Sequence, residues 1–174
     1  SSCQLIMKGM WLARLARPDI FRPLSKLSTR ITRWTRNDDK RLFRLFCYLY
    51  TTSGYRMQCV VSDTHEHVWL ALYVDADFCG DKEDTKSTSG GLLALEGDNT
   101  YYPLCWICKK QTATSRSTTE AEMVSLAGAL FLEAIPMMSL WSKLLSRNVT
   151  LKIHEDNEAT IKVCLLYTSD AADD

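Results

Sequence analysis

The spacing of the hydrophobic residues changes at Val68, and this change divides the chain into a helical part and a part built on strands. Upstream, residues 4–52 show apolar residues at helical spacing, and Asn37-Asp38-Asp39 is placed to cap a helix over 40–51. From Val68 the period becomes two, which predicts a strand over 68–75. One face of this strand would carry Val68, Leu70, Leu72 and Val74, and the other Trp69, Ala71, Tyr73 and Asp75.

The elements that follow predict an α/β fold. Strands are expected at 89–95 and 101–107, joined by a turn at Gly97-Asp98-Asn99, and at 149–155, with a further strand upstream at 55–61. Ser117-Thr118-Thr119 opens a helix that should break near Pro136, which suits the first position of a second helix. A last helix begins over 158–163. The order is a three-stranded antiparallel meander, a helix, a fourth strand and another helix.

Charge is distributed unevenly along the chain, although the net charge is zero. Residues 1–62 carry 12 Lys/Arg against 3 Asp/Glu, whereas residues 63–174 carry 9 against 18. This asymmetry favours a helical segment over 1–62 that meets a polyanion, followed by a separate domain over 63–163. The alternative is that the arginines are solvated helix faces. The aromatic residues among these helices fit core packing better than stacking on bases: Trp34, Tyr48 and Tyr50.

Cysteine and histidine usage gives no metal or disulfide framework. The seven cysteines favour reduced thiols and an intracellular protein. Cys105-Trp106-Ile107-Cys108 has no second pair of ligands at finger spacing, which argues against zinc. His65 and His67 fit a polar turn, and His154 fits a surface or site-rim position.

Three further expectations concern the membrane and the ends of the chain. The apolar stretch 124–141 is interrupted by Glu133 and Pro136, so we expect a soluble protein with no membrane span and no membrane partner. Ser1-Ser2-Cys3 is not an initiator sequence, which places the start upstream. Residues 164–174 resemble the translation of a sequencing-adapter end and are treated as non-native.

Three carboxylates stand where strands end and a helix begins. Asp75 ends the strand from Val68, Glu122 lies early in the helix from Ser117, and Asp156 ends the fourth strand. A compact α/β fold can bring them to one point, and clustered carboxylates bind Mg²⁺.

Each of these assignments has an alternative. Glu122 could complete a capping box with Thr119, and Glu120 could do so for Ser117. Asp77 fits a turn, and Glu155 fits a frayed strand end better than it fits a ligand.

Five short motifs follow one another in a consistent order: Asp75-Ala76-Asp77-Phe78-Cys79-Gly80-Asp81, Lys86-Ser87-Thr88-Ser89-Gly90, Lys109-Lys110-Gln111, Ser117-Thr118-Thr119-Glu120-Ala121-Glu122 and Asp156-Asn157. Together they closely resemble the ribonuclease H domain of copia-type retrotransposon polyproteins. Ala16-Arg17-Pro18-Asp19-Ile20 resembles the stretch that links the reverse transcriptase to that domain. The matches span residues 10–163.

The resemblance implies a ribonuclease H-like fold and endonucleolytic hydrolysis of the RNA strand of RNA–DNA hybrids during reverse transcription. It implies that Asp75, Glu122 and Asp156 are the catalytic residues and hold two Mg²⁺ ions, with Mn²⁺ as a substitute. The implied partners are the hybrid and a reverse-transcriptase domain upstream in the polyprotein, within a cytoplasmic virus-like particle. Phe78, Met123 and Glu155 depart from the family's usual residues.

The family also uses a fourth acidic residue after a fifth strand, which this chain does not reach, so we expect the 174-residue chain to be inactive alone. The rival interpretation is a non-catalytic nucleic-acid-binding or decayed module. An integrase-like nuclease fits the lysine motifs poorly.

Overall fold

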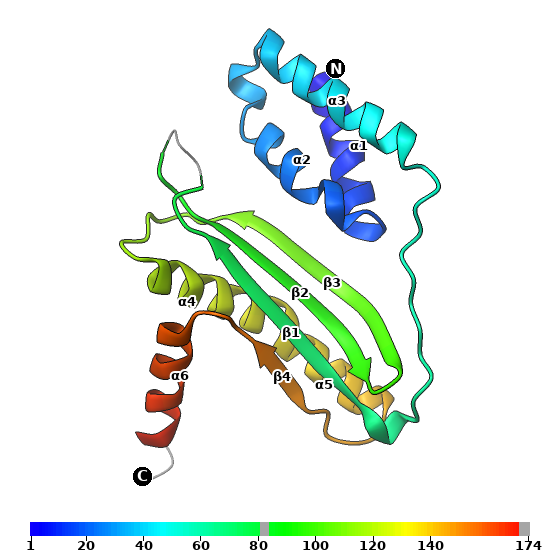
Figure 1. The fold of residues 1–174 in the computed structure, drawn as a ribbon, viewed down its shortest axis with the longest axis vertical. Helices are drawn as coiled ribbons and strands as arrows, with labels where there is room; N and C mark the ends of the chain where they lie inside the picture. Colours follow the sequence, from blue (N-terminus) through cyan, green and yellow to red (C-terminus); the bar gives the residue numbers. More distant parts are fainter. Residues whose placement is uncertain (81–83, 171–174) are drawn as a thin grey trace. The chain divides into compact units, whose positions relative to one another are not determined.

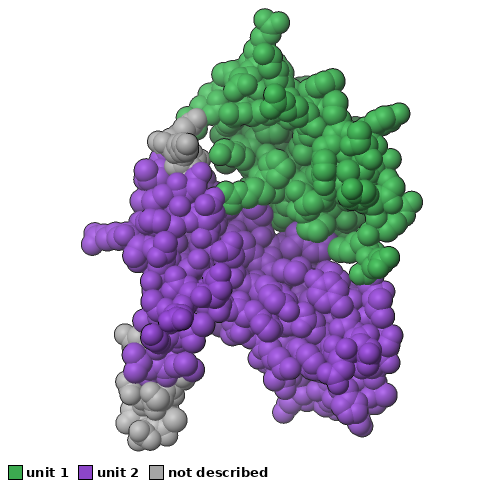
Figure 2. Space-filling model, viewed as in Figure 1, with its two compact units in different colours: residues 1–58 green, residues 59–174 purple. Residues whose placement is uncertain are grey.

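The computed structural model describes residues 1–80 and 84–170. Asp81 of the first motif and residues 171–174 of the suspected adapter segment lie outside the described residues. The chain forms two compact units, Ser1–Gln58 and Cys59–Asp174, which Figure 2 shows in different colours.

The first unit consists of helices, as the sequence predicts. They are α1 (Ser2–Leu15), α2 (Phe21–Ser28) and α3 (Arg36–Thr51), with single turns of 3-10 helix at Pro18–Ile20 and Ile31–Arg33. Gly9 allows α1 and α2 to approach closely, because a Cβ there would lie 3.0 Å from two atoms of Leu24. The buried apolar residues of the unit are Ile6, Ala13, Ile20, Phe21, Leu24, Leu27, Leu42 and Leu45.

Helix α3 begins earlier than predicted. Its N-cap is Thr35, and Asp38 is the third helical residue of a capping box. The Asp38 carboxylate accepts hydrogen bonds from the Thr35 backbone (3.0 Å) and from Arg30 Nε (2.7 Å). The hydrogen bond from Arg30, followed by that from the Thr35 hydroxyl, lowers the pKa of Asp38 to about 2. Asp38 therefore lies within the first turn of the helix, and the prediction that it caps a helix beginning at residue 40 is wrong.

Two further predictions for this part of the chain are wrong. Tyr48 and Tyr50 are 40% and 84% exposed, so they do not form the core. Residues 55–61 form no strand, and only Val60 makes a bridge, to Tyr101. The side chains of 55–61 are all exposed. The segment therefore has no buried face that would fix the register of a strand, and it forms an irregular connection instead.

The second unit is built on a mixed four-stranded sheet, and the predicted α/β fold is confirmed. The strands are β1 (Val68–Asp77), β2 (Thr88–Gly97), β3 (Thr100–Lys110) and β4 (Leu151–His154), in the order β3-β2-β1-β4. The first three form the antiparallel meander, and β4 pairs parallel with β1. This architecture is compatible with a ribonuclease H-like fold. Val68, Leu70, Leu72 and Val74 of β1 are buried, each 7% exposed or less.

One face of the sheet is covered by a long helix (Figure 1). It comprises α4 (Thr118–Ala129), a π-helical segment (Leu130–Ala134) and α5 (Ile135–Leu144). The predicted break near Pro136 is confirmed in part: regular α-helix stops at Ala129 and resumes at Ile135 with Pro136 in its first turn, but the chain stays helical between them. Before the proline the Ile135 N–H donates to the Leu130 carbonyl five residues back, and this wider turn accommodates a ring that would clash in a regular helix. A last helix, α6, covers Glu158–Asp170.

The helix Thr118–Leu144 is also long and apolar enough, by length and composition, to cross a membrane. The stretch is not free of charge, as the sequence predicts, because it contains Glu133, but Pro136 does not end the helix. In this unit Ala129 and Ala134 of the helix pack in the sheet's hydrophobic core.

Candidate metal centre at the carboxyl end of the sheet

The three predicted site carboxylates lie together. Asp75, Glu122 and Asp156 each offer a carboxylate oxygen, and these oxygens all lie within 4.8 Å of one another. Asp75 is near the end of β1, and Asp156 follows β4, whose parallel pairing with β1 brings both carboxyl ends to the same edge. Glu122 comes from the first turns of α4. Their role as metal ligands stays a prediction.

The start of α4 is fixed by residues other than Glu122. The Glu120 backbone N–H donates to the Ser117 hydroxyl (3.1 Å), and the Glu120 carboxylate accepts from the Arg116 backbone (2.6 Å). Glu120 therefore takes the capping role, and Glu122 is not part of a capping box. The Ser125 hydroxyl lies 2.8 Å from the Asp75 carbonyl oxygen, so it holds α4 against β1 next to the cluster.

Glu122 is a buried carboxyl among other carboxyls. It is 6% exposed, and its Oε2 has no hydrogen-bond partner among the described residues. Burial, followed by the negative charges of Glu155, Asp75 and Asp156, raises the pKa of Glu122 to about 7. An ionised carboxylate is unfavourable in a buried position unless a positive charge lies beside it, so the site suits a bound cation.

Glu155 is the residue of this site that the sequence interpretation undervalued. Its Oε1 accepts the Asn157 backbone N–H (2.9 Å), while its Oε2 is buried without a partner among the described residues. Of the three neighbouring carboxylates, its charge has the largest effect on the pKa of Glu122. Period-two alternation already placed Glu155 on the same face as Leu151 and Ile153. From the sequence alone, that position fits a frayed strand end.

Asp77 is the last residue of β1 and borders the turn that follows the strand. The Gly80 N–H donates to the Asp77 carbonyl (3.3 Å), and a Cβ at Gly80 would collide with the Asp77 carboxylate. The carboxylate therefore lies over the turn, in agreement with the turn role expected for it.

The face of the sheet that carries Asp75 also carries paired side chains from β1 and β4. The rings of Tyr73 and His154 stack with centroids 4.4 Å apart, and the Lys152 ammonium lies 3.3 Å from the Trp69 ring centroid. The Tyr73 hydroxyl donates to Glu96 (2.8 Å). His154 is exposed on this face, as expected for a surface residue.

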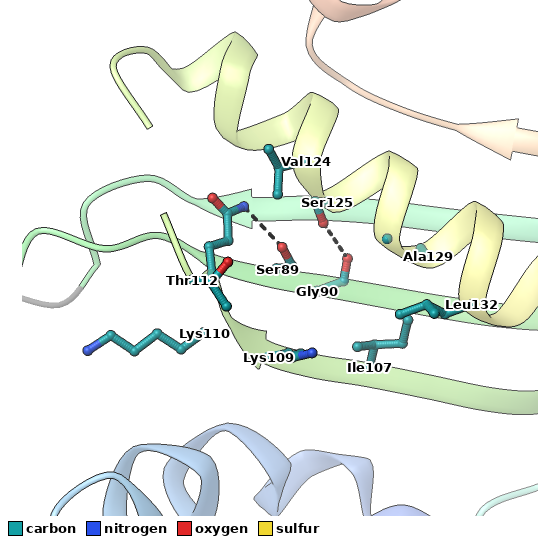
Figure 3. Close-up of a pocket in the computed structure, with 12 residues that line it drawn as sticks. Ser89, Gly90, Ile107, Lys109, Lys110, Thr112, Val124, Ser125, Ala129 and Leu132 are labelled. Atoms are coloured by element: carbon teal, nitrogen blue, oxygen red, sulfur yellow. Dashed lines mark hydrogen bonds between the residues drawn. The ribbon is translucent and has the colours of Figure 1, made fainter. Parts of the chain in front are cut away.

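A separate pocket of about 150 Å³ lies between α4 and the strands β2 and β3 (Figure 3). Gln111 spans it: its amide nitrogen donates to Ser89 Oγ (3.0 Å) and to the Ala121 carbonyl (2.9 Å). Gln111 thereby ties the end of β3 to the turn of α4 that carries Glu122. The described lining contains no carboxylate, so this pocket offers no ligand set for a metal.

The sequence of this chain is similar to segments of two retrotransposon polyproteins. The chain is 35% identical over 122 residues to a retrovirus-related Pol polyprotein from transposon RE1 of Arabidopsis thaliana, and 33% identical over 122 residues to that from transposon RE2. These matches cover 70% of this chain, which spans about 8% of the length of each polyprotein.

A shorter relative matches over most of its own length. The secreted RxLR effector protein 161 of Plasmopara viticola is 32% identical over 120 residues, which are 69% of this chain and 80% of the effector. No family model and no solved structure matches the chain. The chain is similar to one segment of the retrovirus-related Pol polyproteins from transposons, and it belongs to the same sequence family as this effector.

Proposed function

We propose that this chain is the part of a retrotransposon Pol polyprotein that hydrolyses the RNA strand of RNA–DNA hybrids, with Asp75, Glu122 and Asp156 as its metal-binding residues. The observation that carries the proposal is the convergence of their carboxylate oxygens within 4.8 Å of one another. The unpartnered Oε2 of the buried Glu122 adds a reason for a cation to bind there.

The residues fit Mg²⁺ or Mn²⁺, which prefer carboxylate oxygens over nitrogen and sulfur ligands. Such ions supply activation of a water molecule and stabilisation of the leaving oxygen of a phosphodiester. Asp75 and Asp156 are exposed, so a phosphodiester can approach from their side, while Glu122 holds the buried side of the cluster. Ser125 and Gln111 keep the turn that carries Glu122 against the sheet.

Metal binding by the chain itself is the first test. Calorimetric titration with Mn²⁺ should show binding by the wild-type chain and none by Asp75→Asn, which keeps the shape of the side chain but removes the anionic ligand. Asp98→Asn is the matched control, because Asp98 is exposed in the turn between β2 and β3. Equal binding by wild type and Asp75→Asn would remove Asp75 from the site.

Hydrolysis is the second test. A polypeptide that continues downstream through the parent reading frame should cleave RNA in a labelled RNA–DNA hybrid with Mg²⁺ or Mn²⁺, and Asp75→Asn should abolish cleavage. Metal binding without cleavage by the longer polypeptide would favour the non-catalytic module.

A further inference from the structure

The first unit has a large excess of positive charge that its own acidic residues do not offset. Residues 1–58 contain 12 Lys/Arg and 3 Asp. Each aspartate already has partners within the unit: Asp19 pairs with Arg17 (2.8 Å), Asp38 with Arg30 (2.7 Å), and Asp39 accepts from the Trp34 indole (2.8 Å). The unit therefore keeps a net positive charge of +9, which favours association with an external polyanion.

Three of these cationic side chains surround one pocket. Its volume is about 280 Å³, and it is lined by Pro23, Lys26, Leu27, Arg30 and Arg41. Lys26 and Leu27 come from α2, Arg41 comes from α3, and Arg30 lies between these helices. The pocket thus depends on the packing of α2 near α3 and is not a run of charges along a single helix.

A buried aspartate holds two of the cations in place. Asp38 is fully buried, and its Oδ1 lies 2.7 Å from Arg30 Nε and 3.4 Å from an Arg41 guanidinium nitrogen. Side chains that are already ordered lose less entropy when they bind a ligand. With Asp38 included, the four charged groups have a net charge of +2, which favours binding of an anion.

We propose that this pocket binds a phosphodiester group of a nucleic-acid backbone. A guanidinium group matches the geometry of two phosphate oxygens, and Lys26 adds a point charge. Pro23, which is exposed at the pocket, supplies apolar surface for the adjoining sugar. A polyanion with regularly spaced phosphates can also contact the other cations of the unit, whereas an isolated phosphate cannot. The inference does not depend on the metal centre or on hydrolysis.

The test measures nucleic-acid affinity of the full chain by fluorescence anisotropy, with a labelled RNA–DNA hybrid, in EDTA and over a series of salt concentrations. Lys26→Gln should weaken binding about tenfold at ~0.1 M salt and reduce the slope of log K against log salt by about 0.9. The matched control is Lys8→Gln, which removes the same charge from an exposed position on α1. It should change affinity much less.

A second pair of variants tests the pocket from the other helix. Arg41→Gln should behave like Lys26→Gln, and Arg44→Gln, on the same helix outside the pocket, should behave like Lys8→Gln. Helical circular dichroism and the unfolding midpoint of each variant establish that the unit is intact.

Three results would overturn the proposal. Equal losses in Lys26→Gln and Lys8→Gln would mean that the nucleic acid responds only to the overall charge. Loss of binding to phosphatidylserine vesicles in Lys26→Gln, with unchanged affinity for the hybrid, would assign the pocket to a lipid headgroup. Stabilisation of the wild-type chain by inorganic phosphate, with no effect of Lys26→Gln on the hybrid, would make it a site for small anions only.

Discussion

Replacing Glu122 by glutamine should make the metal-free second unit more stable while it abolishes metal binding. Glu122 is buried beside three other carboxylates, and its pKa is raised from 4.5 to about 7. The folded unit therefore binds this proton more tightly than the unfolded chain does, and its stability falls as the pH rises from 4.5 through 7. Glutamine keeps the shape of the side chain and removes the charge.

The magnitude follows from the size of the pKa shift. Each pKa unit corresponds to about 1.36 kcal/mol, so the shift of Glu122 corresponds to about 3 kcal/mol of destabilisation when the carboxyl is ionised. At about pH 8 the folded unit experiences this full cost, whereas at about pH 5 the carboxyl is protonated and less than about 1 kcal/mol remains. The advantage of Glu122→Gln should therefore grow by about 2 kcal/mol between these pH values.

Urea unfolding of the chain in EDTA at both pH values measures this difference, with Trp69 and Trp106 of the sheet as fluorescence probes. Glu158→Gln is the control, because its side chain is 86% exposed and should give the same stability difference at both pH values. A Glu122→Gln variant with no advantage at pH 8, or with an advantage that does not change with pH, would show that Glu122 is not an ionised carboxyl buried among like charges.

The remaining predictions concern metal, the first unit and close packing at a turn. Mg²⁺ or Mn²⁺ at pH 8 should raise the unfolding midpoint of the wild-type chain, with reversal by EDTA and no effect in Asp75→Asn. Asp38→Asn should destabilise residues 1–58 at neutral pH, and urea titrations should show the difference disappearing as the pH falls from 3.8 through about 2, because the pKa of Asp38 is lowered in the folded state. Gly97→Ala should lower the free energy of unfolding by about 1–3 kcal/mol in the same assay, because its Cβ would lie 2.9 Å from the His67 carbonyl oxygen. Gly128→Ala is the contrasting variant: a Cβ there would lie in open space, so it should stabilise its helix by about 0.5–1 kcal/mol.

The arrangement of the carboxylates was predictable because it depends on local signals. Asp75 follows an alternating strand, and Glu122 lies one turn after a helix start. The ends of the parallel strands β1 and β4 meet at one edge of the sheet. The cap at Thr35 was predictable too, since Thr35-x-x-Asp38 has the spacing of a capping box with Asp in the third helical position.

The features that sequence reasoning missed depend on contacts between distant segments. The Oε2 atom of the half-buried Glu155 is covered where the end of β4 meets the rest of the fold, and no local pattern reports that packing. Residues 55–61 have the composition of a strand. A strand also needs a partner strand to pair with, and here the only pairing among the described residues is the bridge between Val60 and Tyr101 of β3. The exposure of Tyr50 likewise depends on how the helices of the first unit pack, and helical spacing alone does not fix it.

The π-helical segment Leu130–Ala134 has a consequence for how this family can tolerate insertions and deletions. A π-turn is equivalent to one residue inserted in an α-helix, and one residue of a regular helix turns by about 100°. Loss of one residue within 130–134 would leave Glu122 facing the carboxylates and Trp141 against the core of the sheet. Loss of one residue between 123 and 129 would rotate Glu122 away from the cluster by about 100° relative to the rest of the helix. Changes in length should therefore accumulate among relatives in the π-helical segment and be excluded from the turns before it.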